Sequence, residues 1–188
     1  TVVVKGSLST VKPVQLVGSG VTVLNGFTID SEGTRANNVS IGAGASNKTL
    51  NNMHFIGATG SIINNTGGVN ITVTNSTFSI AGTGNNAFNL GATSGNITIT
   101  DNTFSFPNGI NMMVAQASTT GSLIFARNHV NGASGGILFY FTAGKNVSFI
   151  NNDITLTGVA SDIILTNGGS GTFDLKDNVV NLTKTTNE

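Results

Sequence analysis

The chain repeats one pattern of apolar and polar positions roughly every 25 residues. Its clearest copy spans 96–106 and reads Asn-Ile-Thr-Ile-Thr-Asp-Asn-Thr-Phe-Ser-Phe. Ile97, Ile99, Phe104 and Phe106 alternate with polar side chains, which is the two-residue period of strands with one buried face. The Asp-Asn step between the two stretches is too short for a helix. The pattern therefore predicts two short strands joined by a tight corner.

The last apolar residue before each polar corner recurs along the whole chain. These anchor residues are Val23, Leu50, Val73, Ile99, Phe125, Phe149 and Leu175. Their spacing of 23 to 27 residues is typical of a solenoid in which each repeat is one coil. A third alternating stretch completes each repeat, as at 87–90 and 137–141. We therefore predict an all-β, single-stranded parallel β-helix of about seven coils, with three short strands in each coil.

The repeat covers the chain without a linker, so residues 1–188 are predicted to form one β-solenoid domain. Residues 1–11 contain the β-branched segment Val2, Val3 and Val4. We interpret them as a lead-in strand of the solenoid or as a strand that adds to another chain. The polar stretch 30–38 is predicted to be a surface loop, and 184–188 a tail outside the last coil.

One column of the stacked repeats is rich in asparagine. It reads Met53, Ser76, Asn102, Asn128, Asn152 and Asn178. Asparagine tolerates the left-handed conformation that a tight corner needs, and stacked amides hydrogen-bond from one strand to the next. Asn102, Asn128, Asn152 and Asn178 are therefore predicted to form a structural ladder. Beside it, Phe55, Phe78 and Phe104 are predicted to stack in the core.

The composition of the chain argues against several kinds of partner and against a membrane-spanning helix. Eight basic and eight acidic residues give no net charge, so the chain has no field that would attract nucleic acid or an anionic membrane. There is no cysteine, and the apolar run 137–141 is far shorter than the roughly 18 residues of a spanning helix. We predict no membrane insertion. Because the chain starts at Thr1, we expect a removed leader or a longer parent chain, and an extracellular or cell-surface location.

The segments 147–154 and 12–29 resemble right-handed parallel β-helix proteins of the pectate-lyase-like superfamily. The resemblance implies a right-handed coil and leaves the function open among lyases, hydrolases, epimerases, phage tailspikes, autotransporter passengers and surface proteins. The enzymes of this fold carry charged residues on the outer face of one sheet. In this chain the outward positions of the third strand instead predict an apolar interaction stripe of Met113, Leu138, Tyr140 and Ile164.

Charged residues meet only in pairs at the polar corners. Asp101 shares a column with Arg127, and His129 shares one with Asp153, which predicts exposed pairs between neighbouring coils. His54 lies three coils from His129, about 14 Å away, too far to share a metal ion. We therefore assign no catalytic residue, metal ligand or cofactor. An outward column of Thr22, Thr49, Thr72 and Thr98 is similar to those of ice-binding solenoids.

These observations predict a non-enzymatic, extracellular structural or adhesive protein. Its open solenoid ends and apolar stripe favour head-to-tail self-assembly into a filament or surface layer. The expected partner is a second copy of the chain, with a host surface or glycan as a further partner. One alternative is an autotransporter-like adhesin passenger, since 125–128 and 149–152 resemble the Phe-x-x-Asn repeats of chlamydial polymorphic outer-membrane proteins. The other alternative is a polysaccharide-active enzyme of the same superfamily.

Overall fold

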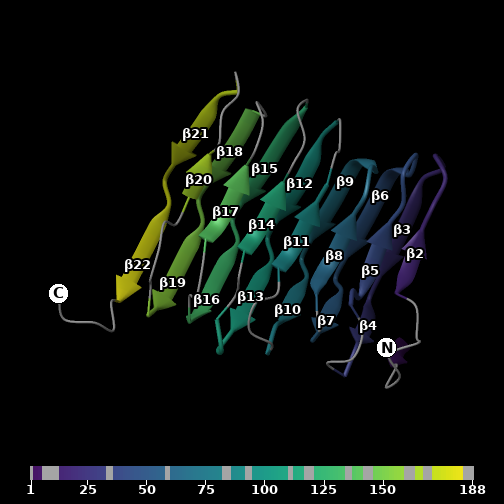
Figure 1. Cartoon of the computed structure of the whole chain (residues 1–188), viewed down its shortest axis with the longest axis horizontal. Coiled ribbons are helices and arrows are strands. Elements are labelled where there is room, and N and C mark those ends of the chain that lie inside the picture. Colours follow the sequence, from purple (N-terminus) through teal and green to yellow (C-terminus); the bar gives the residue numbers. More distant parts are fainter. Residues whose placement is uncertain are drawn as a thin grey trace.

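The computed structural model describes residues 2–5, 13–32, 36–57, 60–81, 86–91, 95–109, 112–116, 121–133, 137–141, 146–158, 164–166 and 171–183. For 2–5, 112–116, 137–141 and 164–166 it describes the backbone only. All regular structure in these residues is β-strand, and none forms a helix that could cross a membrane. Figure 1 shows the strands following one another along the long axis, with the N-terminal end on the right.

The strands form three parallel sheets. Sheet A contains β1 (Val2–Lys5), β4 (Phe27–Asp30), β7 (His54–Ile56), β10 (Thr77–Ser79), β13 (Thr103–Phe106), β16 (His129–Ala133), β19 (Asp153–Thr157) and β22 (Val179–Thr183). Sheet B contains β2 (Val14–Leu16), β5 (Val39–Ile41), β8 (Ser61–Asn65), β11 (Asn86–Leu90), β14 (Met112–Gln116), β17 (Ile137–Phe141) and β20 (Ile164–Thr166). Sheet C contains β3 (Thr22–Asn25), β6 (Ser46–Asn51), β9 (Val69–Thr74), β12 (Ile97–Thr100), β15 (Ser122–Ala126), β18 (Asn146–Ile150) and β21 (Phe173–Lys176).

Each strand pairs in parallel with the strand three elements later, so every turn of the chain adds one strand to each sheet. Coil 1 consists of β2, β3 and β4, and coil 7 consists of β20, β21 and β22. The predicted all-β parallel solenoid with three strands per coil is therefore confirmed. β1 precedes coil 1 and pairs with β4, which makes Val2, Val3 and Val4 the first strand of the solenoid.

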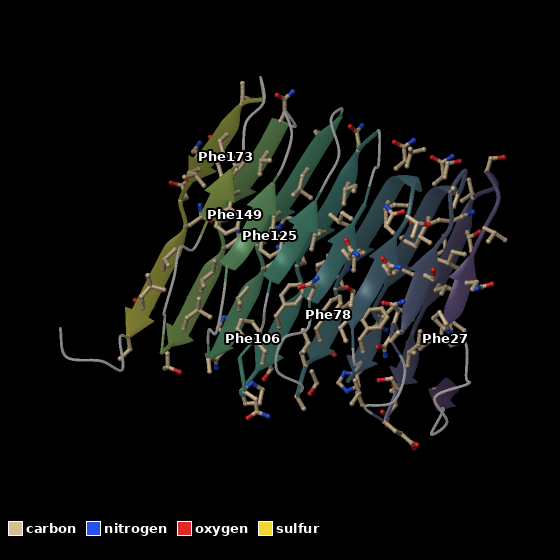
Figure 2. All side chains as sticks on the ribbon, in the orientation of Figure 1. Phe27, Phe78, Phe106, Phe125, Phe149 and Phe173 are labelled. Atoms are coloured by element: carbon tan, nitrogen blue, oxygen red, sulfur yellow. The ribbon has the colours of Figure 1, made fainter. Side chains whose placement is uncertain are left out.

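Alternation along the strands of sheets A and C in coils 2 to 6 sends every second side chain into a shared core. Phe78 stacks between Phe55 and Phe104, with ring centroids 4.8 and 4.5 Å apart. Phe125 and Phe149 continue the aromatic packing at 5.4 Å. Figure 2 shows Phe78, Phe125 and Phe149, which belong to coils 3, 5 and 6, following one another along the long axis. Burial of each such side chain contributes about 1.5–3 kcal/mol, so stacked coils supply a core without disulfides.

The corner between sheets C and A begins with a left-handed residue in successive coils. The non-glycine residues with positive φ at this position are Asn52, Asn75, Asp101, Arg127, Asn151 and Asp177, with φ between 51° and 60°. Each ladder asparagine comes directly after this residue and has no positive φ. The prediction that the ladder asparagines themselves are left-handed is therefore wrong. The strained position precedes them, and even Arg127 adopts it.

The predicted ladder of Asn102, Asn128, Asn152 and Asn178 is present as a hydrogen-bond chain. The backbone N–H and the side-chain amide of Asn102 donate to Oδ1 of Asn128 at 3.0 and 3.1 Å. Asn128 in turn donates from Nδ2 to the Ile99 carbonyl at 2.9 Å. The same bonds recur from Asn128 to Asn152 and from Asn152 to Asn178. Each side chain thus satisfies backbone groups of the coil before its own.

The anchor residue of coil 1 lies one position later in the sequence than predicted. Leu24, not Val23, pairs with buried Leu50, and Val23 pairs with Thr49 on the outer face. Val23 is accordingly 57% exposed. The anchor of coil 1 is therefore Leu24, and the corner from Leu24 to Ile29 has the same length as the corner from Leu50 to Phe55.

The predicted loop at 30–38 is also shorter than expected. Asp30 ends β4, and Asn38 is fully buried with its amide donating to the carbonyls of Ile29 and Ile56 at 2.8 and 3.2 Å. Asn38 therefore belongs to the core boundary and not to the exposed loop. Residues 33–35 and the predicted tail 184–188 lie outside the described residues.

Lys48 is a buried cation in an inward column that begins with Thr22 and is apolar from Ile71 onward. Its side chain is 1% exposed, and its column continues with Ile71 and Ile97. The ammonium group donates to two neutral oxygens of coil 1, the Gly20 carbonyl and Oγ1 of Thr22. Among the described residues these acceptors are uncharged, and a buried charge held by neutral acceptors costs more desolvation energy than the bonds return.

We therefore expect Lys48→Met to raise the free energy of unfolding by about 1–3 kcal/mol, because methionine fills the volume without a charge. Urea titration followed by circular dichroism measures the change. Lys176→Met, which removes an exposed lysine, serves as the control and should change stability by less than about 0.5 kcal/mol. A lower stability of Lys48→Met would show that the ammonium group is needed to close coil 1.

Candidate functional site

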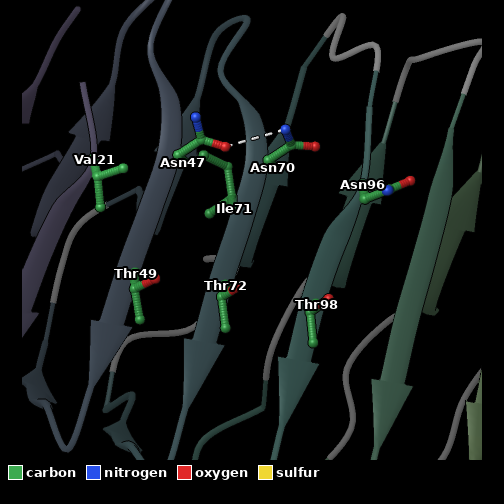
Figure 3. A pocket seen from close by; sticks show the side chains of 8 residues that line it. All are labelled: Val21, Asn47, Thr49, Asn70, Ile71, Thr72, Asn96 and Thr98. Atoms are coloured by element: carbon green, nitrogen blue, oxygen red, sulfur yellow. Dashed lines mark hydrogen bonds between the residues drawn. The ribbon is translucent and has the colours of Figure 1, made fainter. Parts of the chain in front are cut away.

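The outer face of sheet C carries a shallow groove near the N-terminal half of the solenoid. Its volume is about 340 Å³. The groove crosses β6, β9 and β12. Figure 3 shows its lining residues Val21, Asn47, Thr49, Asn70, Ile71, Thr72, Asn96 and Thr98. The lining contains amides, hydroxyls and aliphatic groups but no ionisable side chain. The groove can therefore offer hydrogen bonds and apolar contacts without charge.

The polar groups of the groove form two parallel rows. Thr49, Thr72 and Thr98 pair in register on β6, β9 and β12. A second row begins each of these strands: Nδ2 of Asn70 donates to Oδ1 of Asn47 at 3.2 Å. The predicted threonine column is thus present from Thr49 onward. Thr22 does not belong to it, because Thr22 pairs with Lys48.

The two predicted charge pairs are present at the polar corner. Nε and one terminal nitrogen of Arg127 each donate to Asp101 at 2.7 Å, and Nδ1 of His129 lies 3.2 Å from the Asp153 carboxylate. The hydrogen bond from Arg127 holds the pKa of Asp101 below its ordinary value, and that carboxylate raises the pKa of Arg127. The Asp101 pair therefore stabilises the fold above the ordinary carboxyl pKa and loses this effect as the pH falls through the lowered value.

These pairs are exposed and separate, which limits the chemistry they offer. About half of each side chain of the His129–Asp153 pair is exposed. His54 contacts Thr77 through Nδ1. In the described part of the chain, no group of three His, Cys, Asp or Glu side chains could hold a metal ion. The arrangement fits pairing between neighbouring coils.

Coil 7 leaves an apolar surface exposed, which we call the C-terminal end face and define as Leu175, Val180 and Leu182. These side chains are 58%, 43% and 45% exposed. Their partners in coil 6 are almost fully buried: Phe149, Ile154 and Leu156. The outer edges of β20, β21 and β22 have no neighbouring strand among the described residues. In the described part of the chain, no strand covers the core positions and strand edges at this end.

β14, β17 and β20 carry the four residues of the predicted apolar stripe: Met113, Leu138, Tyr140 and Ile164. The structure describes the backbone of these strands but not their side chains. Ile164 pairs with Phe139, whose column leads back to buried Phe88, and not with Leu138. The prediction that Ile164 continues the column of Leu138 is therefore wrong by one residue. An exposed stripe at these positions stays a prediction.

Sequence reasoning left two features of these surfaces unidentified. It predicted open solenoid ends but did not name the residues of the C-terminal end face, because Leu175 and Val180 follow the same apolar pattern as buried residues of earlier coils. The second is the row of Asn47 and Asn70 beside the threonines. Its signal was the recurring Asn-x-Thr triplet at the start of the sheet C strands. In an extended strand the first and third residues of such a triplet share one face.

Comparison with known proteins gives no relative for this chain: no family model, no curated protein and no solved structure matches it. The parallel β-solenoid is thus shown by the structure itself. Membership of the pectate-lyase-like superfamily stays a prediction.

Proposed function

We propose that this protein is a non-enzymatic, extracellular structural β-solenoid that associates end to end with further copies of itself. The observation that carries the proposal is the C-terminal end face, where three core positions of coil 7 are about half exposed. The proposed partner is the N-terminal coil of a second copy, whose β2, β3 and β4 carry the same three sheets onward.

The registers of the solenoid support this choice of partner. If the columns continue across the junction, Leu175 meets Leu24 of the second copy and Val180 meets Ile29. Leu24 and Ile29 both face the core of coil 1. The junction would therefore repeat the coil-to-coil contact that already recurs within the chain. The neutral composition adds no net repulsion between copies.

Sedimentation velocity of the full chain over a range of concentrations tests the proposal. We expect the average mass to rise with concentration, and Leu175→Asn with Leu182→Asn to weaken association at least tenfold. Ile124→Asn is the matched control, because Ile124 is also exposed but lies on the outer face of sheet C in mid-solenoid. A mass that stays at 19.1 kDa at all concentrations, or an equal loss in the control, would contradict the proposal.

A second candidate function is adhesion to a neutral glycan through the groove on sheet C. Its support is the double row of amides and hydroxyls, since sugar hydroxyls are recognised by such donors and acceptors on a face without charge. Affinity electrophoresis through gels that contain dextran or a soluble cellulose derivative tests it. Thr72→Val should reduce the retardation, whereas Thr155→Val, on the outer face of sheet A, should not. No retardation of the unchanged protein by either glucan would contradict glucan binding.

A further inference from the structure

Sheet A begins one strand earlier than the other two sheets. Among the described strands it runs from β1 to β22, whereas sheet B begins with β2 and sheet C with β3, both in coil 1. β1 therefore lies at the N-terminal edge of sheet A without a coil of its own. It covers β4, with Val3 paired to Thr28 and Val4 to Ile29.

The same edge of β4 is needed in the end-to-end junction proposed above. In a continuous stack, β20 and β21 of one copy pair with β2 and β3 of the next copy. The strand of the first copy that then lies against β4 is β22, since coil 7 ends with β22. β1 of the next copy and β22 of the first copy thus compete for one position.

The registers show how closely the two strands match at this position. The column of Ile29 passes through Phe55, Phe78 and Phe104 to Val180. The neighbouring column leads in the same way from Thr28 to Val179. Val179 and Val180 would therefore take the places that Val3 and Val4 occupy against β4. Both strands present two consecutive valines there.

We propose that β1 is an exchangeable cap on the N-terminal edge, which the β22 of a second copy replaces when two chains join. The proposal rests on the end-to-end association proposed above. It adds that β1 must leave β4 before two chains can join. If β1 stayed in place, it would pair with β22, and each of the other two sheets would lack one strand at the junction. Such a gap leaves backbone N–H and C=O groups unpaired in the interior, which is why replacement is favoured.

A disulfide that fixes β1 to β4 tests the exchange in the full chain. The chain contains no cysteine, so Val3→Cys with Thr28→Cys introduces a single pair at adjacent register positions. We expect the oxidised protein to associate at least tenfold more weakly than the unchanged chain, and reduction to restore association. The control pair is Ser105→Cys with Asn131→Cys, which are exposed register partners in mid-sheet A and should have no effect.

A second variant moves the equilibrium in the opposite direction. Val4→Asp places a carboxylate in the column of buried Ile29, which weakens β1, and we expect association to increase at least threefold. If the unchanged chain associates and neither the disulfide nor Val4→Asp alters it, the cap is refuted while the proposed function stands. Weaker association of Val4→Asp would show that β1 belongs to the junction, which also refutes the cap. If no form of the chain associates, both proposals fail.

Discussion

Phe104→Asp is expected to abolish folding. Phe104 is fully buried between the rings of Phe78 and Phe125, with centroids 4.5 and 6.0 Å away. No described cation lies among these rings to pair with a carboxylate, so the charged form would have to be desolvated without compensation. The cost is expected to exceed about 5 kcal/mol, which is comparable to the whole stability of an ordinary domain.

Far-UV circular dichroism and urea titration measure this loss. Ser105→Asp makes the matched control, because the same carboxylate then sits one residue along on the exposed face of β13. This control should change the free energy of unfolding by less than about 0.5 kcal/mol. A cooperative, native-like transition of Phe104→Asp would show that Phe104 does not face the interior of the solenoid.

Asn128→Leu is expected to produce the second large effect, a loss of about 3–5 kcal/mol. The leucine removes the acceptor of both the backbone N–H and the side-chain amide of Asn102, and the donor to the Ile99 carbonyl. It also removes one donor to Oδ1 of Asn152. Each buried polar group left without a partner costs about 1–3 kcal/mol, and a leucine of similar size does not offset several such losses.

The same substitution at an exposed asparagine distinguishes loss of the ladder hydrogen bonds from the effect of replacing any asparagine by leucine. Asn131 is exposed in β16, three residues beyond Asn128, so Asn131→Leu should change stability by less than about 0.5 kcal/mol. Chemical denaturation of both variants measures the difference. Equal stabilities of the two variants would mean that the ladder contributes nothing beyond the packing of its side chains.

The fold was predictable because the same alternation recurs in every coil. Ile97, Ile99 and Phe104 are buried as their pattern predicts, and the ladder follows from a single aligned column. Repetition compensates for weak local signals, since an error in one coil is corrected by its neighbours.

Both errors are shifts of one residue along a strand. Before the corner at Gly26, Val21 and Val23 alternate as clearly as Thr22 and Leu24, and only the pairing of Leu24 with Leu50 shows that the valines lie outside. A shift of one residue moves every side chain of a strand to the other face. The same offset separates Ile164 from Leu138.

The candidate interaction surfaces could be predicted only in part. The charge pairs Asp101–Arg127 and His129–Asp153 follow from their columns alone. The exposed end face does not, because the exposure of Leu175 depends on what lies beyond coil 7 and not on the residue type. The burial of Lys48 could have been predicted. Lys48 stands between the outward residues Asn47 and Thr49 along its strand, and its partner in the next coil is the apolar Ile71.

Small-angle X-ray scattering of the full chain at increasing concentration tests end-to-end association most directly. Axial growth adds about 34 Å of length for each copy of seven coils, at about 4.8 Å per coil, and leaves the cross-section unchanged. We predict a constant cross-sectional radius of gyration and a length that increases with concentration. A mass fixed at that of one chain, or growth of the cross-section, would contradict end-to-end association.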